Sequence, residues 1–233
     1  MSNLRNKDED PGPGGSPEVW RQRWVEGRTG WDLGAAHRLL PRVLKILKDD
    51  DSLAPGQRVL EPGCGRAHAG AVFADLGMNV TAFDVAPEAI AAANAAYGGK
   101  PNLTLLVADA LTPRPDWYEA FDLVFDRAML CALPPSLRRA YVDACFAHLK
   151  PGALFVSLPF VEVKPGEDGS AGPPYAVPMP ELSELLTPGF AMMHAEEHRT
   201  PDPKDKIVKE MITIWRRRLK PLTERNSATK ARG

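Results

Sequence analysis

The sequence has no excess of charge of either sign and no apolar run long enough to cross a bilayer. Its 29 Lys and Arg residues nearly balance 30 Asp and Glu residues, which leaves a formal net charge of −1. Nucleic-acid binding relies on a basic surface, so this balance predicts no nucleic-acid partner. A membrane-spanning helix needs about 20 consecutive apolar residues. The lack of such a run predicts no membrane partner.

Cysteine is scarce as well. Cys64, Cys131 and Cys145 form a small and odd set, which is untypical of a disulfide framework and favours a reducing compartment. We therefore expect a cytoplasmic protein. No Cys-x-x-Cys pair occurs and no histidine stands at ligand spacing from a cysteine, so we also expect no metal site.

One globular domain is predicted between two polar ends. Residues 1–17 are rich in Gly, Pro and Asp and lack the apolar core of a secretory signal, which is typical of a disordered leader. Residues 18–219 have the length of a single domain, which we expect to be a monomer. Residues 220–233 are predicted to be a flexible tail.

Apolar runs and helical patterns alternate through the middle of the chain. Near-continuous apolar strands separated by helices are typical of a parallel sheet that is covered on both faces. The predicted strands are 58–61, 79–84, 103–109, 121–126 and 152–159, and the predicted helices are 67–76, 87–97 and 136–148.

The N-terminal part is predicted to be helical. Ser16 and Pro17 favour a helix start, and Gly27 and Gly30 interrupt the helix that follows. A second helix is predicted over about 35–48, where Leu and Val recur on one side.

The C-terminal part changes character. A Gly- and Pro-rich loop at 161–179 and a short helix at 181–186 precede strands at 190–198 and 207–216. No helix separates these two strands, so they are predicted to be antiparallel. The predicted fold is therefore α/β and Rossmann-like: a mostly parallel seven-stranded sheet with an antiparallel C-terminal hairpin. This is the layout of class I methyltransferases.

The stretch LEPGCGRAHAG at 60–70 places a Gly-x-Gly turn between the first strand and its helix. Glycines there let a backbone approach a ligand closely, and the helix start favours an anion. Gly63 and Gly65 are followed by Arg66, Ala67 and His68, so the dinucleotide pattern is incomplete. On its own this turn is consistent with a cofactor site or with a tight connection.

Two acids favour the interpretation as a cofactor site. Asp84 ends the second strand about twenty residues after the glycines, where an acid can hydrogen-bond a ribose; the alternative is a cap on the helix that begins at Pro87. Asp109 ends the third strand and could accept from an adenine amino group, with Ala110 leaving room for the ring. The three strand ends predict an adenosine site. NAD and S-adenosylmethionine both fit it, and the C-terminal hairpin favours S-adenosylmethionine.

Four stretches together resemble one family. They are EVWRQRWVEGRTGWDLGAAHRLL at 18–40, LEPGCGRAHAGAVFADLGMNVTAFD at 60–84, FDLVFDRAMLCALPPSLRRAYVDA at 121–144 and GPPYAV at 172–177. They resemble the thiopurine methyltransferase superfamily, which includes halide, thiocyanate and thiol methyltransferases. The likeness extends from Glu18 to about Arg216 and implies an S-adenosylmethionine-dependent methyltransferase.

The resemblance also implies cofactor contacts. The N-terminal helices would lie over the cofactor site, with their tryptophans closing over the methyl donor. Gly63 would lie near the methionine part of the donor, Asp84 would hold its ribose and Asp109 would border its adenine. The implied cofactor-binding residues are Trp20, Trp24, Trp31, Gly63, Asp84, Asp109, Ala110 and Arg127. The alternative for the tryptophans is that they are core residues, although Trp is rarely fully buried.

The acceptor side follows from the same likeness. Arg127 would be the catalytic residue beside the reaction centre, and its alternative is a salt bridge with Asp126. The acceptor pocket would be lined by Trp31, Pro173, Pro174 and Tyr175. Arg66 and His68 depart from the small or acidic residues expected after the glycines.

No Ser/His/Asp or Cys/His arrangement is evident, which suits a soft anionic acceptor that needs no general base. We expect a small-molecule acceptor: a thiol, bisulfide, thiocyanate or halide. The open alternatives are a thiopurine-like or oxygen acceptor, an NAD(P)-dependent oxidoreductase, and a silent scaffold with a relic cofactor fold.

Overall fold

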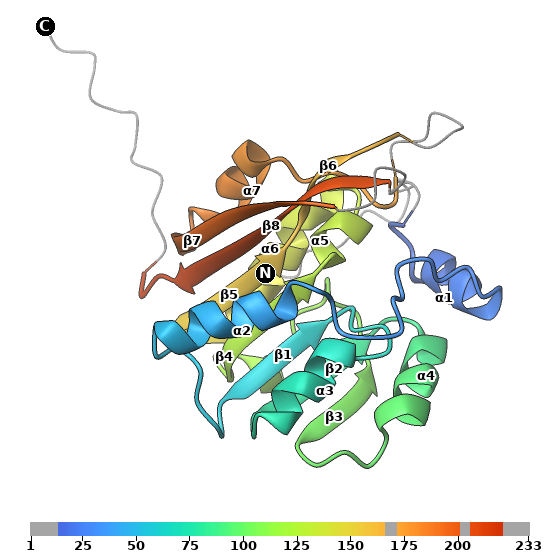
Figure 1. Ribbon diagram of the computed structural model, residues 1–233, viewed down its shortest axis with the longest axis horizontal. Helices are drawn as coiled ribbons and strands as arrows, with labels where there is room; N and C mark the ends of the chain where they lie inside the picture. The colour runs from blue at the N-terminus through green and yellow to red at the C-terminus, as the bar shows by residue number, and fades with distance from the viewer. Residues whose placement is uncertain (1–13, 166–171, 201–205, 221–233) are drawn as a thin grey trace, which may run out of the picture.

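A computed structural model describes residues 14–165, 172–200 and 206–220 of the protein. Five parallel strands form most of its sheet: β1 (Arg58–Pro62), β2 (Asn79–Asp84), β3 (Leu103–Val107), β4 (Phe121–Arg127) and β5 (Leu149–Leu158). The antiparallel part adds β6 (Phe160–Val163), β7 (Phe190–Arg199) and β8 (Ile207–Arg217). The strand order is β3-β2-β1-β4-β5-β8-β6, and β7 also pairs with β8 (Figure 1).

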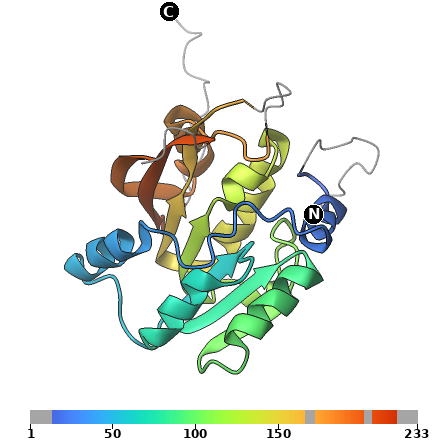
Figure 2. The same cartoon turned by 45° about the vertical axis from the view of Figure 1, so that its right-hand side comes forward.

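Helices cover both faces of this sheet (Figures 1 and 2). Strand residues alternate between two apolar clusters, as pleating requires: Phe155 packs with α6 on one face, while Leu154 and Val156 pack with α2 and α3 on the other. The helices are α1 (Pro17–Val25), α2 (Leu40–Asp49), α3 (His68–Asp75), α4 (Pro87–Tyr97), α5 (Met129–Ala132), α6 (Pro135–His148) and α7 (Met179–Leu186), with a 3₁₀ turn at Pro115–Trp117.

The fold class predicted from the sequence is confirmed, down to the bounds of β2 and α4. Pro87 occupies the first turn of α4, where its missing N–H costs nothing. The start of α2 was predicted wrongly: the helix begins at Leu40, because Pro41 is tolerated only in a first turn. β3 ends at Val107, so Asp109 lies in the loop beyond it.

The stretch 161–179, which was predicted to be a loop, begins within a strand. β6 occupies Phe160–Val163, so the described sheet has eight strands where seven were predicted. The reason is the length of β8: its second half pairs with β5, and its first half extends past β5 and pairs with β6. Gly14 and Gly15, inside the predicted leader, are buried, whereas residues 1–13 and 221–233 lie outside the described residues.

Candidate active site

A cavity of about 710 Å³ opens at the carboxyl ends of the parallel strands. Its floor is formed by the glycine turn after β1, the loops after β2 and β3, and the end of β4. Open α/β sheets bind their ligands at this edge. In Figure 2, α1 lies beside α4 above this edge, and residues of α1 and the segment after it line the cavity as well.

The glycine turn is shaped by positive φ angles and close neighbours. Gly63 and Gly65 have φ of +61° and +54°, which a side chain disfavours. A Cβ on Gly63 would lie 2.5 Å from Met129 Sδ, and one on Gly65 would lie 3.6 Å from the ring of Trp24. The turn therefore leaves its backbone open to the cavity, and the α1 tryptophan packs directly upon it.

Asp84 joins the glycine turn to the next helix. Its Oδ2 accepts from the Gly65 N–H at 3.0 Å, and its Oδ1 accepts from the Ala86 N–H at 3.0 Å. Burial raises the pKa of Asp84. Each carboxylate oxygen has a further lone pair. Asp84 can therefore accept from the backbone at the start of α4 and from a ribose hydroxyl at the same time, so the two predicted roles are compatible.

Asp109 and Ala110 line the cavity beside Asp84. Asp109 Oδ1 accepts from the Leu111 N–H at 2.9 Å, so this carboxylate shapes its own loop as well as facing the cavity. Ala110 is buried and contributes only a methyl group to the wall. Their adenine contacts remain predictions.

Glu61 is a cavity residue that sequence reasoning missed. It is buried, and its Oε2 accepts from the Gly70 N–H at 2.8 Å. Burial, with a smaller contribution from the charge of Asp84, raises the pKa of Glu61 to about 8. An acid inside the apolar run of β1 was the available signal, since an acid in a buried strand needs a reason.

The three tryptophans form an aromatic cap over the cavity and are not core residues. Trp20 and Trp31 meet edge to face with ring centroids 5.4 Å apart, and Trp24 and Trp31 do so at 6.1 Å. No residue of α1 is buried. Trp20 is fixed further by its Nε1–H, which donates to the Gly14 carbonyl at 3.0 Å.

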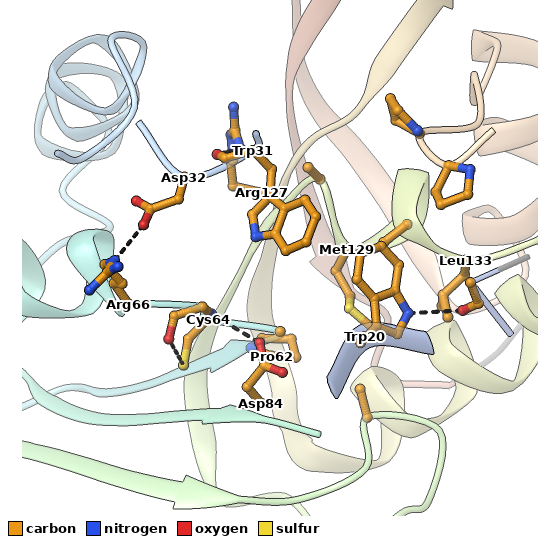
Figure 3. A pocket seen from close by; sticks show the side chains of 18 of the residues that line it. Trp20, Trp31, Asp32, Pro62, Cys64, Arg66, Asp84, Arg127, Met129 and Leu133 are labelled. Atoms are coloured by element: carbon orange, nitrogen blue, oxygen red, sulfur yellow. Dashed lines mark hydrogen bonds and ion pairs between the residues drawn. The ribbon is translucent and has the colours of Figure 1, made fainter. Parts of the chain in front are cut away.

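Asp32, the residue after Trp31, ties this cap to the glycine turn (Figure 3). Its carboxylate pairs with Arg66, and its Oδ1 lies 3.1 Å from His68 Nε2. His68 Nδ1 in turn lies 2.7 Å from the Tyr97 hydroxyl. Arg66 and His68 are the residues that depart from the family pattern, and the structure shows that they anchor the loop of Trp31.

Arg127 ends β4, the strand that pairs with β1, so it lies beside the glycine turn. Its Nη1 donates to the Trp31 carbonyl at 3.5 Å, and its guanidinium lies 5.5 Å from the centre of the Phe160 ring. Asp126 faces another way: its buried carboxylate accepts from the Met129 N–H and from Ser157 Oγ. Burial raises the pKa of Asp126 to about 6.

Pro173 and Pro174 line the cavity, as predicted for the acceptor wall, but Tyr175 does not. The Tyr175 N–H donates to the Cys131 carbonyl at 2.7 Å, and its ring packs against Gly172. Tyr175 therefore has contacts of its own outside the cavity wall.

A second acid that sequence reasoning missed lines the Arg127 end. Glu210 of β8 is buried; it pairs with Arg38, and its Oε2 lies 3.3 Å from His37 Nε2. Burial lowers the pKa of His37 to about 3, so this histidine is neutral. No sequence signal could have joined Arg38 and Glu210, because 172 residues separate them.

The sequence model of the thiopurine S-methyltransferase family matches residues 16–225 of this chain. The chain belongs to the thiopurine S-methyltransferase family. It is therefore an S-adenosylmethionine-dependent methyltransferase, and the oxidoreductase alternative is wrong. The family predicted from four sequence stretches is confirmed.

Individual relatives agree with this membership. Thiocyanate methyltransferase 1 of Arabidopsis thaliana is 33% identical over 204 residues, which cover 85% of this chain and 84% of that protein. Probable thiol methyltransferase 2 of the same plant is 33% identical over 73% of each chain. A Burkholderia thailandensis 1,6-didemethyltoxoflavin N1-methyltransferase, solved with S-adenosylhomocysteine, is 23% identical, covers 87% of each chain and has a TM-score of 0.67, which shows a shared fold.

No helix in the described part of the chain combines the length and apolar character that crossing a bilayer requires. Within residues 14–165, 172–200 and 206–220, no three His, Cys, Asp or Glu side chains gather as metal ligands would.

Proposed function

We propose that this protein transfers the methyl group of S-adenosylmethionine to a small soft nucleophile, such as a thiol, bisulfide, thiocyanate or halide. The observation that carries this proposal is one cavity whose wall has two unlike parts. One part has the open glycine turn and Asp84, and the other begins at Arg127 on the neighbouring strand and has Phe160 and two prolines, beneath an aromatic cap. The plant relatives, which are named as thiocyanate and thiol methyltransferases, support the choice of acceptor class.

The cavity suits the donor in size and chemistry. Its volume of about 710 Å³ lies within the usual range of small-molecule sites. In this proposal Asp84 hydrogen-bonds the ribose of the donor, and Asp109 and Ala110 border its adenine. The rings of Trp20 and Trp31 supply aromatic faces, which attract a sulfonium cation. These assignments extend the roles predicted from the sequence.

The protein's part in the reaction is alignment and exclusion of water. A sulfonium already carries a good leaving group, so the acceptor must be held in line with the methyl carbon and the sulfur. Arg127 supplies a positive charge where an anionic acceptor would sit, and Phe160, Pro173 and Pro174 supply apolar walls that exclude water. We propose a small-molecule acceptor and a monomeric enzyme; the monomer stays a prediction.

Rates with a panel of acceptors test this proposal. Purified enzyme and S-adenosylmethionine would receive, separately, a small thiol, bisulfide, thiocyanate, iodide, a thiopurine and a catechol, with mass-spectrometric detection of methylated products. We expect the highest kcat/KM with one of the first four. A clear preference for the thiopurine or for the catechol would replace the proposed acceptor class.

A further inference from the structure

The acceptor end of the cavity contains a buried carboxylate that the transfer of a methyl group to a permanent anion does not need. Glu210 faces the cavity from β8, with its side chain 3% exposed. In the sheet it stands between Phe160 of β6 and His198 of β7. Since Arg127 lies over the Phe160 ring, Glu210 and Arg127 share one end of the cavity.

Removing a carboxylate from water costs several kcal/mol unless partners compensate. Arg38 and His37, from the segment before α2, hold both oxygens of Glu210. The Leu39 N–H donates to His37 Nδ1 at 3.4 Å, so the hydrogen bonds assign the proton to Nε2, which faces Glu210. With both ring nitrogens engaged, His37 orients the carboxylate and does not itself accept a proton.

The other acids that line the cavity are held by partners of their own. Glu61, Asp84 and Asp109 accept from backbone N–H groups, and Asp32 is held by Arg66 and His68. Glu210 stands opposite Phe160 in the sheet, and Arg127 lies over that ring, so Glu210 is an acid placed beside Arg127. Burial raises the pKa of Glu210, which makes its carboxylate a stronger base than an exposed glutamate.

We propose that Glu210 accepts the proton of a neutral thiol acceptor, and that thiols rather than halide ions are the substrate class of this cavity. This rests on the proposed methyl transfer. The S–H proton moves to the Glu210 carboxylate, and the acceptor sulfur forms a bond to the methyl carbon. The bond from that carbon to the donor sulfonium breaks, and its electron pair stays on S-adenosylhomocysteine. Glu210 then returns its proton to solvent.

The same carboxylate disfavours halides by charge. An iodide ion beside Arg127 would also lie near the negative charge of Glu210, and in a cavity of reduced dielectric constant this repulsion is larger than in water. A neutral thiol does not meet this repulsion. At pH 7 a thiol of ordinary pKa near 8.5 is only a few per cent thiolate, so an enzyme that accepts the neutral form has about thirtyfold more substrate available.

Glu210→Gln tests this proposal, with Glu196→Gln as the matched control. Glu196 also stands in the antiparallel part of the sheet and pairs with an arginine of the α2 region, Arg42 at 2.7 Å, but it does not line the cavity. The glutamine at 210 keeps a side chain of the same size. The readouts are kcat/KM for a small thiol and for iodide, each at pH 7 and at pH 9.5.

We expect Glu210→Gln to lower kcat/KM for the thiol about 10- to 30-fold at pH 7, following the thiolate fraction, and to restore it at pH 9.5. The value for iodide, which carries no proton, should stay equal or rise. Glu196→Gln should behave as wild type. An equal loss with both acceptors would overturn the proposal and leave Glu210 a structural residue.

The wild-type protein offers a second test that does not depend on the variant folding. With Glu210 as proton acceptor, kcat/KM for total thiol should be nearly flat from pH 7 to 8.5. A rise of roughly 16-fold over this range, which is the rise in the thiolate fraction of a thiol of pKa 8.5, would show capture of thiolate from solution and would overturn the proposal. The charged or titratable groups that face Glu210 or line its end of the cavity are His37, Arg38, Arg127, His198 and Lys206. Failure to methylate any acceptor would instead refute the methyl-transfer function itself.

Discussion

Replacing Asp32 with asparagine should loosen the aromatic cap and weaken cofactor binding. The Asp32 carboxylate is only 12% exposed and holds Arg66, 38% exposed, and His68, 16% exposed. A hydrogen bond to a charged group contributes about 1.5–3 kcal/mol, and an exposed ion pair about 0–1 kcal/mol. Because this pair is intermediate in exposure, we expect Asp32→Asn to reduce the free energy that favours the closed position of the Trp31 loop by about 1–2 kcal/mol.

That loss appears in cofactor affinity if the Trp31 loop must close for binding. Since about 1.4 kcal/mol corresponds to a tenfold change in Kd, Asp32→Asn should weaken S-adenosylhomocysteine binding roughly 5- to 30-fold. Isothermal titration calorimetry measures this Kd directly. The difference from wild type should shrink in high salt, which screens the partly exposed pair.

The matched control is Glu26→Gln. Glu26 pairs with Arg28 in the same N-terminal segment, but the pair is exposed, at 38% and 60% for the two side chains. It should leave the Kd unchanged. If Asp32→Asn binds S-adenosylhomocysteine within twofold of wild type, Arg66 and His68 do not hold the cap closed, and the loop's position is set by other contacts.

Three further substitutions probe the rest of the site. Trp31→Leu should weaken the binding of S-adenosylmethionine more than that of S-adenosylhomocysteine, by about 0.5–2 kcal/mol, because only the donor carries the sulfonium charge that an aromatic face attracts. Equal increases in the two Kd values would mean that Trp31 contributes only by filling space. Gly63→Ala forces a Cβ to 2.5 Å from Met129 Sδ at a φ of +61°, so cofactor affinity should fall at least about tenfold; Gly56→Ala, with a φ of +83° and no neighbour within 4 Å, should lower the melting temperature but keep the affinity. Burial raises the pKa of Glu61 to about 8, above its unfolded value, so its contribution to the unfolding free energy is present below about pH 4.5 and is lost as pH rises through 8; urea titrations from pH 5 to 9 should show this decline, and Glu61→Gln should flatten it.

Local chemistry made part of this structure predictable. The bounds of α4 follow from Pro87 and the paired glycines after Tyr97, and β2 follows from its β-branched run. The strand-end positions of Gly63 and Asp84 follow from the alternation of strands and helices, because the carboxyl ends of parallel strands meet at one edge. The cavity lies at that edge.

Long-range pairing was not predictable in the same way. The strand β6 forms because β8 extends past β5, and nothing within residues 160–163 signals this partner. The ion pairs of Glu210 with Arg38 and of Asp32 with Arg66 join residues far apart in the chain. The sequence shows Glu210 as an acid in an apolar strand and Asp32 as an acid in a loop, but it does not identify the partner of either, so their roles emerge from the fold.

Transfer of a labelled methyl group tests the proposed function most directly. Purified protein would receive S-adenosylmethionine with a trideuterated methyl group together with a small thiol, and mass spectrometry would follow both products. We predict a trideuterated methyl thioether that forms in a one-to-one ratio with S-adenosylhomocysteine. Tight cofactor binding with no labelled product from the thiol, bisulfide, thiocyanate or iodide would contradict methyl transfer to a soft nucleophile in this cavity.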